Sequence, residues 1–525
     1  MSPGRTEPAI PDAHLAPPLL RRADQALALA TRYVLATQRG DGSWRAVPDP
    51  RITETALCTL ALARSPYPGA GRAAERGKAW LVAGAAPQRH HPVAHAVETA
   101  LRSLALDTGE PVDVSHPAFT DRALSARARL LASVALHTAR PTRGGAEPAA
   151  LRARLAAAVA APERLKRWTQ VELWSAHALV ELHFGDRAAA LRATRLIADQ
   201  QSPAGDFFAN PVSTALAALA LQAAAPGTAA IRRCTEYLLA SQLADGTWRF
   251  VSSDVWDTAL TLRVFRGAAD FDDRGAGRAV AFLVAAQNPD GGWPYRSGVE
   301  SDNDTTAAAL IALAGACGAP AATLRAGLRH LADQQTPDGL WRTWQSAGDP
   351  PVDDVIAHVV TALDRHVDRH RVPVAAARDW LAGRFAQQGR WHAGWYRGLP
   401  YATAEVLPAF DAAAHAGGHP AARALAATRN ADGGWPVEPG DPSTPVATGL
   451  ALAALERGGV HDATYGTQGL RHLLRTQRDD GTWPGVPLMY GPRPLLTHFP
   501  TQNHALTADG LFAVVRRLRA AGGTP

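Results

Sequence analysis

Hydrophobic positions along the chain gather in runs that are rich in Ala and Leu and are broken by short turns containing Gly. Such runs occupy residues 55–63, 213–223, 258–265, 306–314 and 444–455. Ala and Leu are strong helix formers, and runs of β-branched residues, which favour strands, are few. The pattern predicts helices over these ranges and a chain that is mostly helical.

The turns that separate the helical runs repeat one motif. Residues 38–44 read QRGDGSW, and the same Gln-to-Trp spacing returns at residues 242–248, 287–293, 335–341 and 477–483. Residues 429–435 keep everything but the Gln, residues 201–207 end in Phe, and residues 388–391 are a shortened copy. From residue 207 onward, successive aromatic ends lie 41 to 50 residues apart.

Each copy is expected to end one helix at its Gln, to turn at Asp-Gly, where Gly supplies a positive φ, and to pack its Trp back. Repeats of this size stack into rings of paired helices. We therefore expect an all-α fold in which the Gln and Trp side chains tie neighbouring helices together and take no part in chemistry.

Length and composition narrow the class of protein. With 525 residues, 46% of them hydrophobic, the chain can form two or three domains with large cores. The formal net charge is +6, and the Arg residues are scattered among acidic ones, so no basic tract indicates nucleic-acid binding. The mildly positive charge does suit an anionic ligand such as a diphosphate.

Cysteine usage and the N-terminus bear on location. Cys58, Cys234 and Cys317 lie apart in apolar surroundings, without the spacing of a metal site or a disulfide framework. No apolar run reaches the roughly 18 residues that span a membrane. Residues 1–18 lack the apolar core of a secretory signal, and we expect them to be a disordered lead-in. These features predict a soluble, cytoplasmic protein.

One stretch, Glu300 to Ala307, stands out for its polar residues. It places the carboxylates of Asp302 and Asp304 two residues apart, before two Thr and a helical run. Asp and Ser ahead of such a run usually mark a helix N-terminus. Taken alone, the stretch is most simply a capping turn, and the repeats around it raise a second interpretation, in which one carboxylate does chemistry.

The repeated Gln-x-x-x-Gly-x-Trp turn resembles the QW motif of the squalene–hopene cyclase and class II terpene cyclase superfamily, over about residues 38–484. Residues 201–215, 254–260 and 390–404 resemble further segments of this superfamily, in the same order. The resemblance implies two α/α-barrel domains, called β and γ, with γ inserted after the first helix of β. By this resemblance, residues 1–45 plus 252–525 form the β domain and residues 46–251 form the γ domain.

Class II cyclases carry the motif D-x-D-D-T-A, whose middle Asp is the general acid. Here the stretch reads D-x-D-T-T, with Asp302 first, Asn303 at x, Asp304 as the acid and Thr305 in place of the last Asp. This variant resembles bacterial drimenyl diphosphate synthases, which act on farnesyl diphosphate. We expect Asp304, Asp302 and Thr305 to be catalytic, and Asn303 and Thr306 to contact the substrate.

The expected chemistry makes a specific demand on the acid. Protonation of an alkene requires a neutral carboxylic acid aimed at carbon, and burial and a neighbouring carboxylate both raise the pKa of an Asp. Asp302 provides that neighbour for Asp304, whereas Thr305 can only donate a hydrogen bond or position a water. The group that returns a proton to Asp304 is not evident in the sequence.

A carbocation needs stabilisation by groups that are not nucleophiles, and aromatic faces provide it. Trp256 is the first candidate, because residues 254–260 resemble the segment that opens the catalytic domain of squalene–hopene cyclases. Trp344, Trp395, Tyr396 and Tyr401 are further candidates. For each of them, packing in the core is the competing interpretation.

The sequence has no DDxxD motif, which class I terpene synthases use to ionise a diphosphate, so we expect the diphosphate to be retained. Lys166, in the region where copalyl diphosphate synthases carry a basic residue, and Arg493, in a Pro/Gly loop, are the expected diphosphate contacts. Related enzymes use Mg²⁺ through an acidic motif in the γ domain. That motif is missing, and Glu54 and Glu98 are the candidate Mg²⁺ ligands, with a structural role as the alternative.

The leading hypothesis is a class II sesquiterpene cyclase that converts farnesyl diphosphate into bicyclic drimenyl diphosphate. The alternatives are a copalyl-type diterpene cyclase acting on geranylgeranyl diphosphate, a triterpene cyclase, a protein prenyltransferase β-subunit and a non-catalytic helical scaffold. The isolated cysteines argue against the zinc site of a prenyltransferase, and a scaffold leaves the D-x-D-T-T stretch unexplained. The expected partner is an isoprenyl diphosphate, with a homodimer as a further expectation.

Overall fold

The structure of the protein is a computed structural model that describes residues 17–84, 86–108, 147–162, 165–344, 350–411, 417–491 and 493–522. Helices dominate the described residues, and the two strands β1 (Met489–Tyr490) and β2 (Leu496–Thr497) form one short antiparallel hairpin. The prediction of an all-α fold is confirmed. Most of the expected N-terminal lead-in, residues 1–16, lies outside the described residues.

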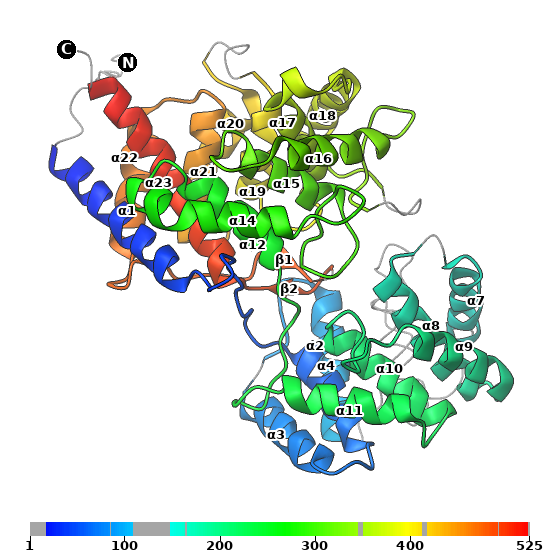
Figure 1. Ribbon diagram of the computed structural model, residues 1–525. Helices are drawn as coiled ribbons and strands as arrows, with labels where there is room; N and C mark the ends of the chain where they lie inside the picture. The colour runs from blue at the N-terminus through cyan, green and yellow to red at the C-terminus, as the bar shows by residue number, and fades with distance from the viewer. Residues whose placement is uncertain are drawn as a thin grey trace, which may run out of the picture.

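Six helices form a closed inner ring in the larger of two lobes (Figure 1). They are α12 (Asp254–Phe265), α15 (Asn303–Leu313), α17 (Asp353–Asp364), α19 (Leu399–Val406), α21 (Pro445–Arg457) and α23 (Pro500–Gly522). Each packs against the next, and α23 returns to pack against α12. The ring is the inner wall of an α/α barrel.

A second layer of helices covers this ring. It comprises α14 (Gly277–Ala285), α16 (Ala321–Asp333), α18 (Ala375–Gln388), α20 (Pro420–Ala426), α22 (Ala463–Thr476) and α1 (Pro17–Thr37). The N-terminal helix α1 lies beside the C-terminal helix α23, so both ends of the chain belong to this lobe (Figure 1). Short elements complete it: α13 (Ala269–Phe271) and the helical turns η3 (Asp272–Ala276), η4 (Val367–Arg369) and η5 (Leu407–Ala409).

The QW turns join an outer helix to the inner helix that follows it. In the copy at residues 287–293, the indole N–H of Trp293 donates to the carbonyl oxygen of Leu283 at 2.6 Å, ten residues back. Gln287 donates to the carbonyl oxygens of Gly291 at 2.8 Å and of Thr323, on the neighbouring outer helix, at 3.0 Å. The same Trp hydrogen bond is made by Trp44, Trp248, Trp341, Trp391, Trp435 and Trp483. The predicted tying role of Gln and Trp is confirmed.

The glycine of the turn is required by its conformation and by its surroundings. Gly291 has a φ of 84°, which L side chains rarely adopt. A Cβ at this position would lie 2.6 Å from the carbonyl oxygen of Ala326 in α16. The positive φ is the role that the sequence pattern predicts, and the close approach to α16 is an additional reason for glycine here.

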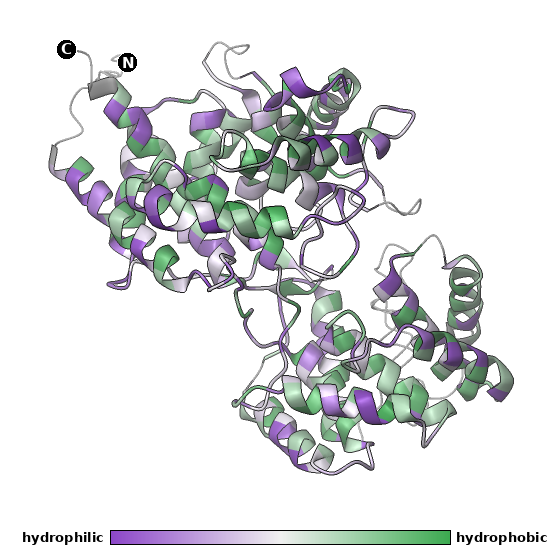
Figure 2. Ribbon diagram, in the orientation of Figure 1, coloured by the Kyte–Doolittle hydropathy of each residue, from purple (hydrophilic) through white to green (hydrophobic). Residues whose placement is uncertain are grey.

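The smaller lobe is also helical. Its centre is formed by α2 (Ile52–Ala63), α4 (Pro92–Leu106), α8 (Arg167–His183) and α10 (Pro211–Ala224), with α10 packed on both α2 and α8. Around them lie α3 (Ala70–Ala83), α7 (Glu147–Val159), α9 (Arg187–Asp199) and α11 (Ala229–Ser241). Hydrophilic residues mark one side of outer helices such as α3 and α1, as expected for helices with one side in water (Figure 2).

Two separate hydrophobic cores support the two lobes. One joins residues between Ala23 and Trp44 to residues between Val255 and Val515, and the other contains residues between Ile52 and Trp248. The domain boundaries assigned by resemblance stay a prediction. Within the described ranges, no helix has the length and apolar character needed to cross a membrane.

Candidate active site

A cavity with about 1050 Å³ of empty space lies where the two lobes meet. The smaller lobe contributes Lys166, Trp168, Thr169, Glu172 and Asn210 to its wall. The larger lobe contributes the N-terminal ends of α12 and α15, the hairpin strand β1 and aromatic residues before α17 and α19, namely Ser253, Trp256, Tyr295, Asp302, Asp304, Thr305, Trp344, Trp395, Tyr396, Met489 and Tyr490. The cavity therefore gathers most of the residues that the sequence singles out.

Asp302 is the N-cap of α15, as the capping interpretation predicts. Its Oδ1 accepts a hydrogen bond from the backbone N–H of Thr305 at 2.6 Å, and the Thr305 hydroxyl also bonds to it. The other oxygen of Asp302 is buried without a hydrogen-bond partner. Burial and the charge of Asp304 raise the pKa of Asp302 to about 8, so its carboxyl is largely neutral at pH 7.

Asp304 lies two residues after this cap, lines the cavity and is 5% exposed. Its Oδ1 lies 2.6 Å from Nδ1 of His358, which projects from α17. The second ring nitrogen of His358 lies 2.9 Å from Oε2 of Glu405 on α19. Both ring nitrogens thus face carboxylate oxygens, and an imidazolium satisfies both because it donates from each nitrogen.

The electrostatic surroundings of His358 agree with that protonation state. Burial alone would lower the pKa of His358, but the charges and hydrogen bonds of Asp304 and Glu405 raise it to about 10. Oδ2 of Asp304 has no hydrogen-bond partner within the described residues, and Asp304 lines the cavity. Asp304 therefore has one oxygen fixed by His358 and one left for a proton aimed at a ligand.

A third carboxyl comes from α17, four residues before His358. Oδ1 of Asp354 accepts a hydrogen bond from the backbone N–H of Gly394 at 2.7 Å, and its other oxygen is buried without a partner. Burial and the charge of Asp304 raise the pKa of Asp354 to about 7. The carboxyl groups of Asp302, Asp304 and Asp354 thus gather at the N-terminal ends of α15 and α17.

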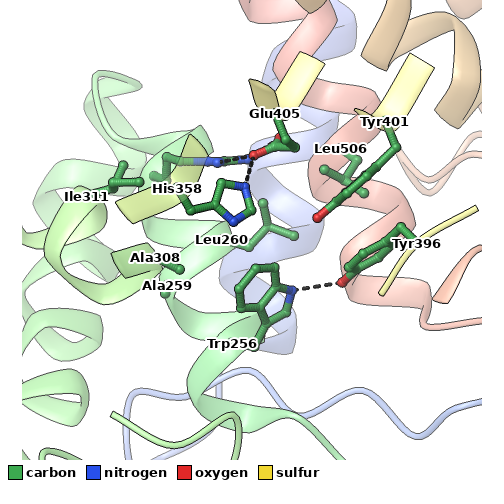
Figure 3. A pocket seen from close by; sticks show the side chains of 11 residues that line it. Trp256, Ala259, Leu260, Ala308, Ile311, His358, Tyr396, Tyr401, Glu405 and Leu506 are labelled. Atoms are coloured by element: carbon green, nitrogen blue, oxygen red, sulfur yellow. Dashed lines mark hydrogen bonds and ion pairs between the residues drawn. The ribbon is translucent and has the colours of Figure 1, made fainter. Parts of the chain in front are cut away.

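Aromatic rings line the path from the cavity toward His358. The indole N–H of Trp256 donates to the Tyr396 hydroxyl at 2.8 Å, and that hydroxyl donates to Gln502 at 2.8 Å. Tyr396 stacks on Tyr401 with ring centroids 4.1 Å apart. Beyond Trp256 and Tyr396 lies a small inner cavity, walled by Leu260, Ile311 and Leu506 and reached by the Tyr401 side chain (Figure 3). Trp256, Tyr396 and Tyr401 are therefore brought together.

Lys166 lies at the wall of the cavity among three tryptophans. Its Nζ is 4.4 Å from the centre of the Trp344 ring, 5.6 Å from that of Trp395 and 5.8 Å from that of Trp168. Aromatic faces attract an ammonium group in this geometry. Lys166 therefore places a fixed positive charge in the same cavity as Asp304, on the side of the smaller lobe.

Among the expected substrate contacts, Tyr401 lines only the inner cavity, and three others line neither cavity. Asn303 is turned toward the adjacent loop, where its side chain donates to the carbonyl oxygen of Arg342 at 2.8 Å. Thr306 accepts from the backbone N–H of Trp293 at 2.8 Å and so belongs to the QW turn. Arg493 donates to the carbonyl oxygen of Gly394 at 2.9 Å and stacks over Tyr490. These contacts indicate structural roles.

The two candidate Mg²⁺ ligands lie in the smaller lobe. The Glu54 carboxylate is completely buried and paired with Arg51, whose guanidinium hydrogen-bonds to both of its oxygens. Glu98 accepts from the backbone N–H of Gln88 at 2.8 Å, and burial raises the pKa of Glu98 to about 7. A carboxylate already neutralised by Arg and a carboxyl that tends to stay protonated do not fit a magnesium site. Within the described residues no group of three or more His, Cys, Asp or Glu could hold a metal, and the Mg²⁺ requirement stays a prediction.

His358, Glu405 and Asp354 were not predicted as functional from the sequence. Asp354 and His358 are spaced four apart, which places them on one side of a helix, and this is the only local signal that they share. Glu405 lies 47 residues further along the chain. Only the ring closure of α15, α17 and α19 brings the three side chains to Asp304.

Comparison with known proteins agrees with this architecture. Residues 344–491 match the squalene–hopene cyclase C-terminal domain family. The drimenyl diphosphate synthase of Streptantibioticus cattleyicolor is 31% identical over 343 residues, 60% of this chain and 64% of that protein. The drimenyl diphosphate synthase of Streptomyces showdoensis is 30% identical over 297 residues, 55% of this chain and 48% of that protein.

A solved structure extends the comparison to the whole fold. The ent-copalyl diphosphate synthase from Streptomyces platensis aligns with 96% of this chain and 100% of its own, with a TM-score of 0.55 and 18% sequence identity. The match in sequence is thus partial, while the match in fold covers both lobes. Residues 344–491 thus resemble a squalene–hopene cyclase C-terminal domain, the chain spans less than two thirds of the length of the two drimenyl diphosphate synthases it matches, and its fold is similar to that of the ent-copalyl diphosphate synthase.

Proposed function

We propose that the protein is a class II terpene cyclase that protonates the terminal alkene of an isoprenyl diphosphate with Asp304. The most probative observation is the carboxyl of Asp304, which is bonded at one oxygen to His358 and faces an aromatic-lined cavity with the other. The preferred substrate is farnesyl diphosphate and the product is bicyclic drimenyl diphosphate. The names of the two relatives and the D-x-D-T-T stretch support this chain length.

In the proposed first step, the proton on Oδ2 of Asp304 is transferred to the terminal alkene, and a tertiary cation forms. His358, as an imidazolium, stabilises the carboxylate that remains, through the 2.6 Å hydrogen bond to Oδ1. The pKa of Asp302, raised to about 8, leaves that carboxyl largely protonated at pH 7, and the pKa of Asp354, raised to about 7, leaves that one about half protonated. Asp304 differs from both by its hydrogen bond to His358.

In the following steps, two internal alkenes attack the cation in turn, and each attack closes one ring. Loss of a proton from a ring carbon adjacent to the final cation then forms the product alkene. One proton enters and one leaves, so the product is an isomer of the substrate. The faces of Trp256, Tyr396 and Tyr401 supply cation–π stabilisation of about 2 kcal/mol for a desolvated, well-placed ring.

The diphosphate has a separate place in this scheme. Lys166 lies on the part of the wall that the smaller lobe contributes, and its ammonium group is surrounded by tryptophans. The substrate would then extend from Lys166 to Asp304, with its hydrocarbon chain across the aromatic wall. Retention of the diphosphate is proposed because the sequence lacks the DDxxD motif.

The test incubates purified protein separately with farnesyl diphosphate and geranylgeranyl diphosphate in the presence of Mg²⁺, followed by dephosphorylation and product identification. A bicyclic alcohol from the C15 substrate supports the proposal, and a C20 product alone would reassign the enzyme to the copalyl type. No cyclic product from either substrate would refute the cyclase assignment. Asp304→Asn should abolish turnover in a folded protein, whereas Asp290→Asn, in an exposed QW turn, should not.

A further inference from the structure

Behind the acid lies a chain of charged side chains that the expected motif does not include. Glu405, on α19, is 2% exposed and accepts a hydrogen bond from His358. Arg263, on α12, donates to both of its oxygens, at 2.7 and 2.8 Å. The side chains of His358 and Glu405 face each other at one end of the inner cavity, with Trp256 below them (Figure 3).

We propose that Glu405 is a positioning residue that keeps His358 doubly protonated and aimed at Asp304 while Asp304 itself is neutral. The inference rests on the proposed function, because it concerns the state of the acid before it donates its proton. The argument starts from the charge balance around the buried imidazole.

Before the reaction, Asp304 must be a neutral carboxylic acid, so it offers His358 no negative charge. A buried imidazolium without a counter-ion loses its proton readily, because burial disfavours the charged form. Glu405 is the other carboxylate in contact with His358 and provides that counter-ion. After proton transfer, the Asp304 carboxylate becomes a second counter-ion of His358. Glu405 thus allows His358 to stay charged on both sides of the step.

Glu405 is in turn held ionised. Burial alone would raise its pKa, but Arg263 and His358 hold the pKa of Glu405 well below its usual range. Arg457, on α21, approaches the carboxylate to 3.8 Å and is paired with Asp509 on α23. Arg cannot be deprotonated in proteins, so Arg263 and Arg457 keep their positive charges at every pH of interest.

The surrounding groups complete the balance. Asp304 on α15 and Asp354 on α17 are the other acids near His358, and Tyr396 and Tyr401 keep neutral hydroxyls because burial raises their pKa values well above the usual range. When Asp304 and Asp354 are both protonated, the ion-paired groups here are three cations (His358, Arg263 and Arg457) and two carboxylates (Glu405 and Asp509), and Arg266 and Arg365 lie near the same arginines. Positive charge is then in excess before proton donation, and the Asp304 carboxylate offsets part of it afterwards. The cluster stabilises the charge that the reaction creates.

The central variant is Glu405→Gln, which keeps the size and an acceptor oxygen and removes the charge. We expect kcat at pH 7 to fall at least tenfold with KM within about twofold, because the effect is confined to the acid. The alkaline limb of kcat should move to lower pH, since His358 then loses its proton more easily. A uniform loss at every pH, or an unchanged kcat, would refute the positioning role.

A measurement without substrate separates this inference from the proposed function. In Asp304→Asn, which imitates the neutral acid, ¹⁵N NMR of the histidine ring should show His358 doubly protonated at pH 7. In the double variant Asp304→Asn/Glu405→Gln, the ring should be neutral at that pH. A neutral ring in the single variant, or a charged one in the double variant, would overturn the inference even if the enzyme cyclises prenyl diphosphates.

A matched control exists in the smaller lobe. Glu181 is also buried, accepts hydrogen bonds from Arg152 and lies 3.7 Å from His177, but has no contact with Asp304. Glu181→Gln should leave kcat and its pH profile unchanged. If Glu405→Gln does not fold, Glu405→Asp carries the test: it retains the charge, so the alkaline limb must stay in place while kcat falls, and a shifted limb would refute the proposal.

Discussion

The raised pKa of His358 should make the stability of the protein depend on pH in the alkaline range. The unfolded chain has the ordinary value of 6.5, and the folded value is about 10. A folded pKa above the unfolded one means that the stabilisation is fully present below pH 6.5 and is lost as pH rises toward 10. At about 1.4 kcal/mol per pH unit, the interval corresponds to at most roughly 5 kcal/mol, because the value of about 10 includes the charge of Asp304, and a neutral Asp304 leaves Glu405 as the counter-ion.

The assay compares urea unfolding of the wild type and of His358→Gln at pH 6, 8 and 10. The wild type should lose several kcal/mol of unfolding free energy over this range beyond what His358→Gln loses. His504→Gln is the control: burial lowers the pKa of that ring to about 4, so between pH 8 and 10 His504 is neutral in both the folded and the unfolded chain, and its replacement should not change the slope in that interval. Equal slopes for wild type and His358→Gln would refute the assignment of an imidazolium between Asp304 and Glu405.

Three further predictions concern the remaining site residues. Lys166→Gln removes the positive charge that lies among the three tryptophans, and steady-state kinetics should show KM for a prenyl diphosphate raised about tenfold at nearly constant kcat. The control is Lys78→Gln, at a lysine paired with Glu75 away from the cavity, which should change neither KM nor kcat. Trp256→Leu removes one ring of the aromatic wall, so kcat should fall roughly 30-fold, the equivalent of about 2 kcal/mol of cation–π energy, as single-turnover rates would reveal. Glu98→Gln should leave any Mg²⁺ dependence unchanged in a chelator titration. The pKa of Glu98 is raised from 4.5 to about 7, so the wild type should lose unfolding free energy as the pH rises from 4.5 to 7. Glu98→Gln, which cannot ionise, should lose less over the same rise in urea unfolding.

Much of the fold could be predicted from the sequence because its signal is local and repeated. Each QW turn contains the residue that ends a helix, the glycine with a positive φ and the tryptophan that packs back. The tryptophan bonds to a residue only ten positions earlier, as Trp293 does with Leu283. The capping role of Asp302 could be predicted for the same reason. The closure of six inner helices into a ring depends on contacts between distant residues, and only the resemblance to a known superfamily supplied it.

The sequence predicts only part of the site, because adjacent residues at the start of a helix point in different directions. Asp302, Asp304 and Thr305 line the cavity, while Asn303 and Thr306, between and beside them, point to a loop and to a QW turn. Successive residues of a helix are about 100° apart, so a motif of five letters cannot all face one ligand. His358 and Glu405 come from other helices and have no motif of their own.

The hydroxyl at position 305 has a structural explanation in this arrangement. Thr305 is 1% exposed and bonds to the cap residue Asp302 through its backbone and its side chain. A carboxylate in its place would add a charge beside Asp302, Asp304 and Asp354, where burial already raises pKa values to about 8 and about 7. It would also oppose the positive charge that His358 and the two Arg provide when the acid is neutral. If Asp304 is the acid, as we propose, groups from α17 and α19 orient it without a carboxylate at position 305. Thr305 therefore fits the distribution of charge in this site.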